Sequence, residues 1–130
     1  MPGLQHVERL RVAWADTDAG GRSHFAAALR YAEVAENGLR RKLGLLEDWA
    51  DYPRRRVEAE YLAVLRFEDE VDVVISTERL GRTSITWVWR IERGGELCVQ
   101  GRHTVVHVDG GGRPSPLPER VRAALGAGDR

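Results

Sequence analysis

Cysteine is almost absent from this sequence, with Cys98 as its single example. One cysteine can form no internal disulfide and cannot begin a cysteine metal cluster. An excess of basic charge is missing too, because 20 Lys and Arg are balanced by 20 Asp and Glu. Since nucleic-acid binding depends on a basic surface, this balance disfavours a nucleic-acid partner.

Long apolar runs are also missing. No stretch approaches the roughly 20 apolar residues that cross a bilayer, and the first ten residues, MPGLQHVERL, lack the basic start and apolar run of a signal peptide. We therefore expect a cytoplasmic protein without membrane insertion. Its 130 residues suit a single domain over 1–130.

Two kinds of hydrophobic periodicity are present. Residues 7–15 alternate in the manner of a half-buried strand, whereas residues 24–43 carry apolar side chains at steps of three and four, which predicts a long helix. Many of these helical positions are alanine, so the helix can lie close to another layer. Ser23 is its expected N-cap and Gly44 its expected stop.

The rest of the chain is predicted to be mostly strand. Strands are expected over 54–64, 70–80, 83–93 and 96–108, with a short helix over 119–125. Gly94-Gly95 is a two-residue hairpin signal. One helix cannot cover both faces of a five-stranded sheet. An antiparallel sheet curled around the helix and paired with a second copy would satisfy burial, so we expect an oligomeric α+β protein.

The stretch WADTDAGGRSHFAAALRYAE, residues 14–33, places two aspartates and a glycine turn at the start of the predicted helix. Free N–H groups at a helix start suit an oxyanion or a polarised carbonyl. A carboxylate beside them can act as nucleophile or general base. The alternative is that Asp16 and Asp18 only cap the helix and shape the turn.

The longer run WADTDAGGRSHFAAALRYAEVAENGL resembles the signature of hotdog-fold acyl-CoA thioesterases. It is most similar to the 4-hydroxybenzoyl-CoA thioesterase family, including the Tol-Pal-associated members. The likeness continues through RRRVEAEYLAVLRFEDEVDV and ERLGRTSITWVWRI, and so covers residues 7–108. It implies a five-stranded antiparallel sheet around a long central helix, in a homodimer or homotetramer. It also implies an acyl-CoA substrate, no metal and no bound cofactor.

The resemblance also implies residue roles. Asp18 takes the position of the catalytic carboxylate, as nucleophile or general base, and Asp16 supports it. The backbone N–H near Phe25 polarises the thioester carbonyl. Relatives often have Tyr-His at the helix entry where this chain has His24 followed by Phe25, so His24 is a second catalytic candidate. In some relatives a helix glutamate is the base, which makes Glu33 a supporting candidate beside Glu36.

Substrate contacts follow from the same resemblance. Trp14 stands where Tyr or Phe is usual, and the small Ala27 and Ala28 replace an Asn-Tyr pair, which we hypothesise widens the acyl pocket. The turn with Arg82, Thr83 and Ser84 meets coenzyme A in the resembling enzymes, and arginine suits phosphate. The alternative for that turn is simple solvation, and its residues could reach the site from a second subunit.

Other features have weaker interpretations. The cluster Arg54-Arg55-Arg56 either meets phosphates or makes a charged sheet edge. His103 and His107 share a strand face but lack a third ligand, so no metal site is predicted. Three rival functions stay open: a hotdog dehydratase using His24 with Glu36, a thioesterase acting on a carrier-bound polyketide, and a non-catalytic acyl-CoA-binding module. The sequence does not reveal the acyl group.

Overall fold

The computed structural model describes residues 4–126, apart from the side chains of residues 48–50. Its elements, in chain order, are β1 (Gln5–Arg11), the 3-10 turn η1 (Trp14–Asp16), α1 (Phe25–Lys42), the 3-10 turn η2 (Leu46–Asp51), β2 (Arg54–Tyr61), β3 (Glu70–Leu80), β4 (Ser84–Arg93), β5 (Glu96–Val106) and α2 (Glu119–Gly126). Every predicted helix and strand is therefore present; the strand over 70–80 has the predicted ends, and the other elements are shifted at one or both ends.

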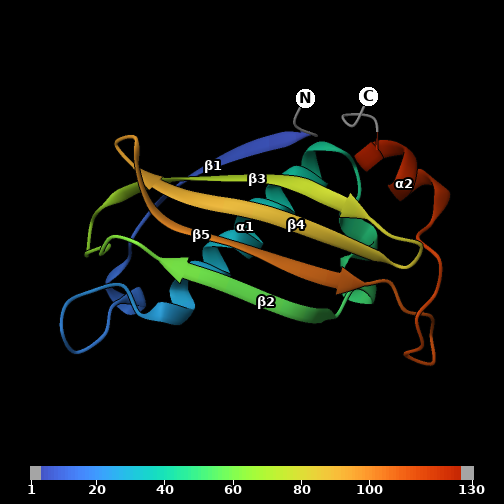
Figure 1. Ribbon diagram of the computed structural model, residues 1–130, viewed down its shortest axis with the longest axis horizontal. Coiled ribbons are helices and arrows are strands. Elements are labelled where there is room, and N and C mark those ends of the chain that lie inside the picture. The colour runs from blue at the N-terminus through green and yellow to red at the C-terminus, as the bar shows by residue number, and fades with distance from the viewer. Residues whose placement is uncertain (1–3, 127–130) are drawn as a thin grey trace.

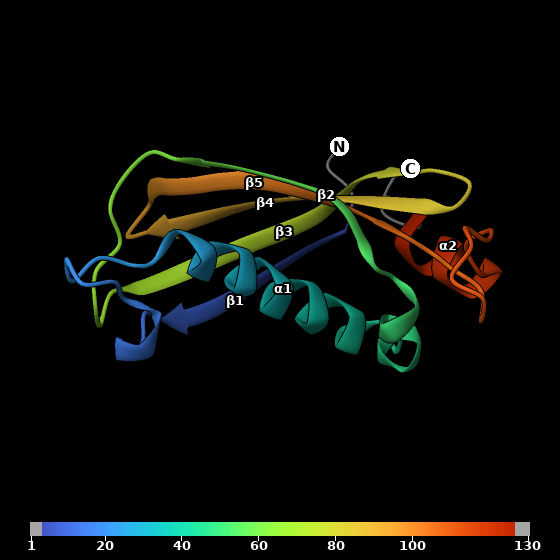
Figure 2. The same cartoon turned by 90° about the horizontal axis from the view of Figure 1, so that it is seen from below.

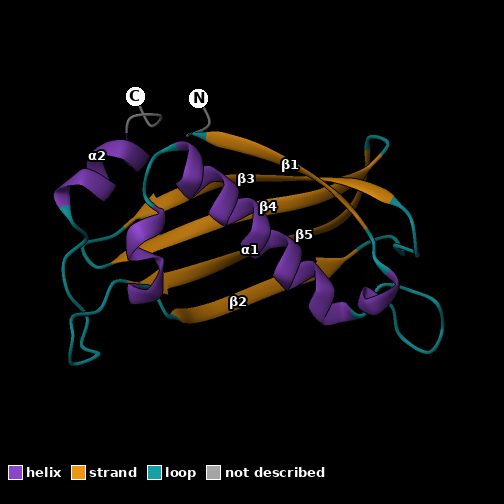
Figure 3. Ribbon diagram, turned by 180° about the vertical axis from the view of Figure 1, so that it is seen from behind, coloured by secondary structure: helices purple, strands orange, loops and turns teal. Residues whose placement is uncertain are grey.

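The five strands form one antiparallel sheet in the order β1-β3-β4-β5-β2. Helix α1 crosses a single face of this sheet and packs against β1, β3 and β4 (Figures 1 and 3). Seen from below, the sheet curls around the helix (Figure 2). This is the hotdog arrangement that the resemblance implies. Strands β1 and β2 are the two edges.

Alternation explains which face of the sheet is covered. In β4 the side chains of Ile85, Trp87, Trp89 and Ile91 are buried, whereas the residues between them are not. Ala32 of α1 is fully buried in the same core. Alanine lets the helix approach the sheet closely, and each large apolar side chain buried there contributes roughly 1.5–3 kcal/mol. Trp87 and Trp89 therefore lie in the core beneath the helix.

The end of α1 and the β4–β5 turn match their sequence signals. Gly44 adopts φ 73°, and its N–H and that of Leu45 bond back to the helix at 3.2 and 2.8 Å. This double closure is the Schellman motif, for which glycine is preferred. Gly94 and Gly95 both have positive φ, 56° and 87°, as a tight hairpin turn requires.

The helix start differs from the prediction. His24, not Ser23, is the N-cap, and its Nδ1 accepts the Ala26 N–H at 3.1 Å. Ser23 is held one step earlier, because its own N–H bonds to the Leu65 carbonyl at 2.8 Å. A contact with a distant segment has therefore overridden the local preference for serine as a cap.

The first and second strands end earlier than predicted. After β1 the chain turns into η1, where the Asp16 N–H bonds to the Ala13 carbonyl at 2.9 Å. Trp14 is consequently outside the strand, 69% exposed, and meets Phe67 edge-on at 5.3 Å. Strand β2 stops at Tyr61, after which the N–H groups of Leu62 and Ala63 both bond to the Cys98 carbonyl, at 2.8 and 3.0 Å. Among the helices described, none has the length and apolar character to cross a bilayer.

Candidate active site

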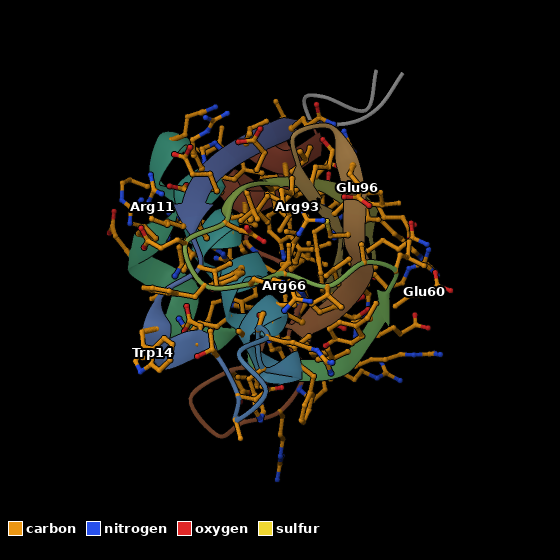
Figure 4. All side chains as sticks on the ribbon, turned by 90° about the vertical axis from the view of Figure 1, so that its left-hand side faces the viewer. Arg11, Trp14, Glu60, Arg66, Arg93 and Glu96 are labelled. Carbon is orange, nitrogen blue, oxygen red and sulfur yellow. The ribbon has the colours of Figure 1, made fainter. Side chains whose placement is uncertain are left out.

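A pocket of about 320 Å³ opens beside the N-terminal end of α1. It lies between the helix start, the end of β2 with the loop that follows, and β5. Its lining residues are Asp18, Arg22, Ser23, Phe25, Ala28, Tyr61, Leu62, Ala63, Val64, Leu65 and Val99. Figure 4 looks onto this end of the molecule. The pocket therefore contains the predicted catalytic carboxylate.

A larger hollow of about 510 Å³ lies over the outer face of the sheet and contains none of the predicted site residues. Its polar side chains are paired across the surface: Gln100 donates to Glu60 at 2.6 Å, and Arg102 donates to Glu78 at 3.1 Å. Because these groups already satisfy one another, the smaller pocket is the better site candidate despite its size.

Asp18 stands at the pocket mouth with an exposed side chain. Its Oδ1 accepts the N–H groups of Gly20 at 2.8 Å and Arg22 at 3.3 Å, and so closes its own turn. Gly21 completes the turn with φ 78°, a conformation that favours glycine. Within the described part of the chain, Oδ2 has no hydrogen-bond partner, so one carboxylate oxygen is available to a ligand.

Asp16 is buried and holds the loop that carries Asp18. Its carboxylate pairs with Arg30 and accepts the Tyr31 hydroxyl at 2.6 Å, while its carbonyl accepts the His24 N–H at 2.7 Å. Burial raises the pKa of Tyr31, so this phenol remains a donor at neutral pH. Asp16 thus fastens the loop that carries Asp18 to the first turns of α1.

The start of α1 forms part of the pocket and carries an unpaired backbone donor. Phe25 lines it, and among the residues described here nothing accepts the Phe25 N–H. The Phe25 carbonyl accepts the Tyr61 hydroxyl at 2.6 Å, which ties the helix start to the end of β2. His24 caps the helix and stacks on Phe25 at 4.5 Å between ring centres, but it is not part of the pocket lining.

The opposite wall of the pocket is fixed by Arg93, at the end of β4. Its guanidinium donates to the Val64 carbonyl at 2.6 Å, to Asp69 at 3.0 Å and to Glu96 at 2.7 Å. Arg66 and Arg93 lie near the middle of the view in Figure 4. Burial would raise the pKa of Asp69, but the Arg66 N–H and the Arg93 guanidinium together bring it below its ordinary value.

Sequence reasoning missed Arg93. Next to Gly94-Gly95 it looks like an ordinary turn residue, and nothing local indicates that it reaches back 29 residues to Val64.

A second polar cluster is buried farther along α1. Glu36 accepts from His103 Nε2 at 2.8 Å, from Arg54 at 2.9 Å and from Arg40 at 3.3 Å. Trp89 donates its indole N–H to His103 Nδ1 at 3.2 Å, which places the ring proton of a neutral His103 on Nε2, facing Glu36. Burial would raise the pKa of Glu36, but His103, Arg54 and Arg40 outweigh it and leave that pKa lowered.

The His24–Glu36 pair on which the rival dehydratase would depend is not formed. Glu36 bonds to His103 instead, because His24 lies more than three helical turns earlier on α1. Glu33 is half-exposed, 3.8 Å from Arg54, and outside the pocket lining. The cluster connects α1 to β5 and β2, and its carboxylate is fully occupied by its partners.

The turn with Arg82, Thr83 and Ser84 lies at the other end of the sheet from Asp18 (Figure 1). It is fastened there by the C-terminal segment: the Leu117 N–H bonds to the Arg82 carbonyl at 2.9 Å, and Arg122 donates to the Gly81 carbonyl at 2.7 Å. One chain therefore does not bring this turn to the pocket. Within the described residues no cluster of three or more His, Cys, Asp or Glu side chains could hold a metal.

Comparison with known proteins agrees with this fold. The family model of the thioesterase-like superfamily matches residues 12–125. A thioesterase from Thermus thermophilus, solved with coenzyme A and Zn, is 32% identical with a TM-score of 0.85, covering 94% of this chain and 92% of that one. No curated protein matches the chain.

More distant structures share the fold. A 1,4-dihydroxy-2-naphthoyl-CoA thioesterase from Synechocystis has a TM-score of 0.89 at 18% identity, covering 98% of this chain and 99% of that one. A gentisyl-coenzyme A thioesterase has a TM-score of 0.82 at 23% identity, covering 92% and 98%.

The sheet, the central helix and the pocket at its start define a hotdog-fold protein with an enzyme-like site. The chain belongs to the thioesterase-like superfamily, whose enzymes hydrolyse thioesters.

Proposed function

We propose that this protein is an acyl-CoA thioesterase with Asp18 as its reacting carboxylate. The observation that carries the proposal is the pairing of an exposed carboxylate, with one free oxygen, and an unpartnered helix-start N–H at the mouth of one apolar pocket. The coenzyme A in the Thermus thermophilus structure supports a coenzyme A thioester as the substrate.

In this mechanism the acyl group enters the pocket and its carbonyl oxygen meets the Phe25 N–H. A donor at that position stabilises the negative charge that develops when the carbonyl is attacked. Asp18 then either attacks the carbonyl carbon, giving an anhydride that water opens, or takes a proton from an attacking water. In both routes the C–S bond breaks, the sulfur leaves as thiolate and gains a proton, and the acyl group leaves as a carboxylic acid.

A second copy of the chain completes the proposed site. The inner face of β2 lies beyond α1, so Val57 and Tyr61 remain 43% and 48% exposed, next to an unpaired strand edge. Antiparallel pairing of two such edges about a two-fold axis would place the far end of one sheet beside the pocket end of the other. The turn with Arg82 could then meet the substrate from the partner, in a homodimer or a homotetramer of two such dimers.

We further propose that the protein has no nucleic-acid partner, because its charge is balanced, and that it is cytoplasmic. We assign neither His24 nor Glu33 a chemical step in this mechanism. His24 lies near the helix start and Glu33 lies on the helix, both outside the pocket lining. The rival dehydratase has less support, because the His103–Glu36 pair that resembles an acid–base dyad is buried and outside the pocket.

The test is free-thiol release from a panel of acyl-CoAs, comparing the wild-type protein with Asp18→Asn. Asparagine keeps an oxygen that can close the turn but removes the charge. We expect wild-type turnover to fall by roughly a hundredfold or more, the size of a lost acid–base group. Unchanged turnover would move the chemistry away from Asp18. Binding of acyl-CoA without any turnover would favour the non-catalytic module.

A further inference from the structure

The pocket separates polar from apolar groups by depth. The polar lining residues Asp18 and Arg22 are exposed at the mouth, whereas Ala28, Leu65 and Val99 are 2%, 4% and 2% exposed. These three buried residues offer only hydrocarbon. One turn deeper along α1 is the fully buried Ala32. Once past the hydroxyls of Ser23 and Tyr61 near the helix start, an acyl chain would thus meet only these apolar side chains among the described lining residues.

The two hydroxyl side chains in the lining, those of Ser23 and Tyr61, lie near the helix start and already donate their hydrogens to backbone carbonyls. Tyr61 donates its hydroxyl to the Phe25 carbonyl at 2.6 Å, and Ser23 donates to the His24 carbonyl at 3.4 Å. Buried side-chain atoms without a partner occur elsewhere in the described chain, at His6, Arg40, Thr77 and Trp87, none of which lines the pocket. A hydroxyl on the inner part of an acyl group would therefore lose its water without gaining a partner.

We propose that this pocket selects an unsubstituted hydrocarbon acyl group of medium size, and that Ala28 sets how much of it fits. The inference rests on the proposed thioesterase function. A pocket of about 320 Å³ holds on the order of ten non-hydrogen atoms, taking the roughly 30 Å³ share of a liquid water as a guide. That is a straight chain of about eight to ten carbons or one plain aromatic ring.

Ala28 is the specificity residue because, among the described lining residues, it alone comes from the body of α1 beyond the first residue, and it is buried. Ala28→Val adds two carbons and Ala28→Leu adds three at this position. Each added carbon takes the place of about one carbon of the acyl group, so the preferred chain shortens accordingly. Ala26→Leu is the matched control, since Ala26 is exposed on the same helix turn and outside the pocket.

The experiment measures kcat/KM for straight-chain acyl-CoAs from four to sixteen carbons, and for the pair benzoyl-CoA and 4-hydroxybenzoyl-CoA. We expect the highest kcat/KM either for a straight chain of eight to ten carbons or for benzoyl-CoA. Which of the two is the better substrate shows whether the pocket takes a chain or a ring. The hydroxylated ring should be roughly 10- to 100-fold poorer than the plain one. Ala28→Leu should move the straight-chain optimum down by two to three carbons, and Ala26→Leu should leave it in place.

Equal use of the plain and hydroxylated rings, or an unshifted optimum in a folded Ala28→Leu variant, would overturn the inference. Ala28→Val serves where circular dichroism shows that Ala28→Leu fails to fold. Binding of non-hydrolysable S-alkyl-CoA thioethers, measured by calorimetry, separates this inference from the thioesterase proposal. Selective binding without turnover of the esters would sink only the function. Turnover of the esters without selectivity among the thioethers would overturn only the proposed selectivity. Failure to bind any thioether would also overturn the proposed selectivity.

Discussion

The chain builds the same turn twice, once at the pocket and once away from it. Residues 18–22 and 109–113 both read Asp-x-Gly-Gly-Arg. Asp109 Oδ1 accepts from Gly111 and Arg113 at 2.8 and 3.1 Å, as Asp18 Oδ1 does from Gly20 and Arg22 at 2.8 and 3.3 Å.

The backbones of the two turns also agree. Gly21 and Gly112 adopt φ 78° and 79°. The N–H of the aspartate that begins each turn donates to the backbone carbonyl of the arginine that ends it, at 2.7 Å in the first turn and 2.9 Å in the second. In Figure 1 the two loops lie at opposite ends of the sheet. The hydrogen bonds of Asp18 are therefore explained by the turn alone, and what distinguishes it is its neighbourhood: a helix start and an apolar pocket.

The largest effect is expected at a third carboxylate, Glu36, which belongs to neither turn. Removing it by Glu36→Ala leaves Arg40 buried without its partner, which costs about 3–5 kcal/mol of unfolding free energy. Urea denaturation measures this loss. If Glu36→Gln instead remains stable and loses turnover, the reacting carboxylate would be Glu36, and the contrast between the two turns would lose its meaning.

The lowered pKa of Glu36 gives this prediction a pH dependence. A carboxyl group whose pKa is lower in the folded than in the unfolded state stabilises the fold above its unfolded value, about 4.3, and ceases to do so as pH falls through the folded value. The gap in unfolding free energy between wild type and Glu36→Gln should thus be full at pH 7 and shrink below about pH 4. A difference in unfolding free energy that stays constant with pH would contradict the view that it comes from the charge of Glu36.

The next effect tests the two turns directly. Asp18→Asn should lose roughly a hundredfold of turnover, about 2.7 kcal/mol of activation free energy, whereas Asp109→Asn should lose none. Both variants keep an oxygen that can close the turn, so their melting temperatures should remain close to that of the wild type. Equal turnover by the two variants would remove the special status of the turn at the pocket.

Much of this could be predicted from the sequence, and the limits have a physical cause. Periodicity predicted each helix and strand, and the run from Trp14 singled out Asp18 and the helix start, because these signals are local. The pocket wall is not local: it depends on Arg93 reaching Val64, and Glu36 meets His103 across 67 residues. His24 and not Ser23 is the N-cap for the same reason, because the Ser23 N–H bonds to the carbonyl of the distant Leu65.

A smaller effect is expected from changing the backbone glycine of each turn, which tests whether the shape of the turn matters for stability alone or also for turnover. Gly21→Ala and Gly112→Ala each place a side chain on a left-handed backbone, where no neighbouring atom lies within 4 Å. Each should cost about 1–2 kcal/mol of unfolding free energy, measured by thermal melting. Only Gly21→Ala should also lower kcat, because only that turn aims a carboxylate at the pocket. Loss of kcat in both variants would indicate a general effect of stability.

The smallest effect concerns His24, which adjoins the turn at the pocket and has no counterpart at the other. Because its Nδ1 caps α1, His24→Ala should cost about 1 kcal/mol of unfolding free energy, and His24→Asn, which restores a capping side chain, should recover most of it. If capping is its main role, kcat should follow stability and recover in the asparagine variant too. A hundredfold loss of kcat in a stable His24→Asn protein would instead make the imidazole part of the chemistry, and the second turn would then lack two reacting groups instead of one.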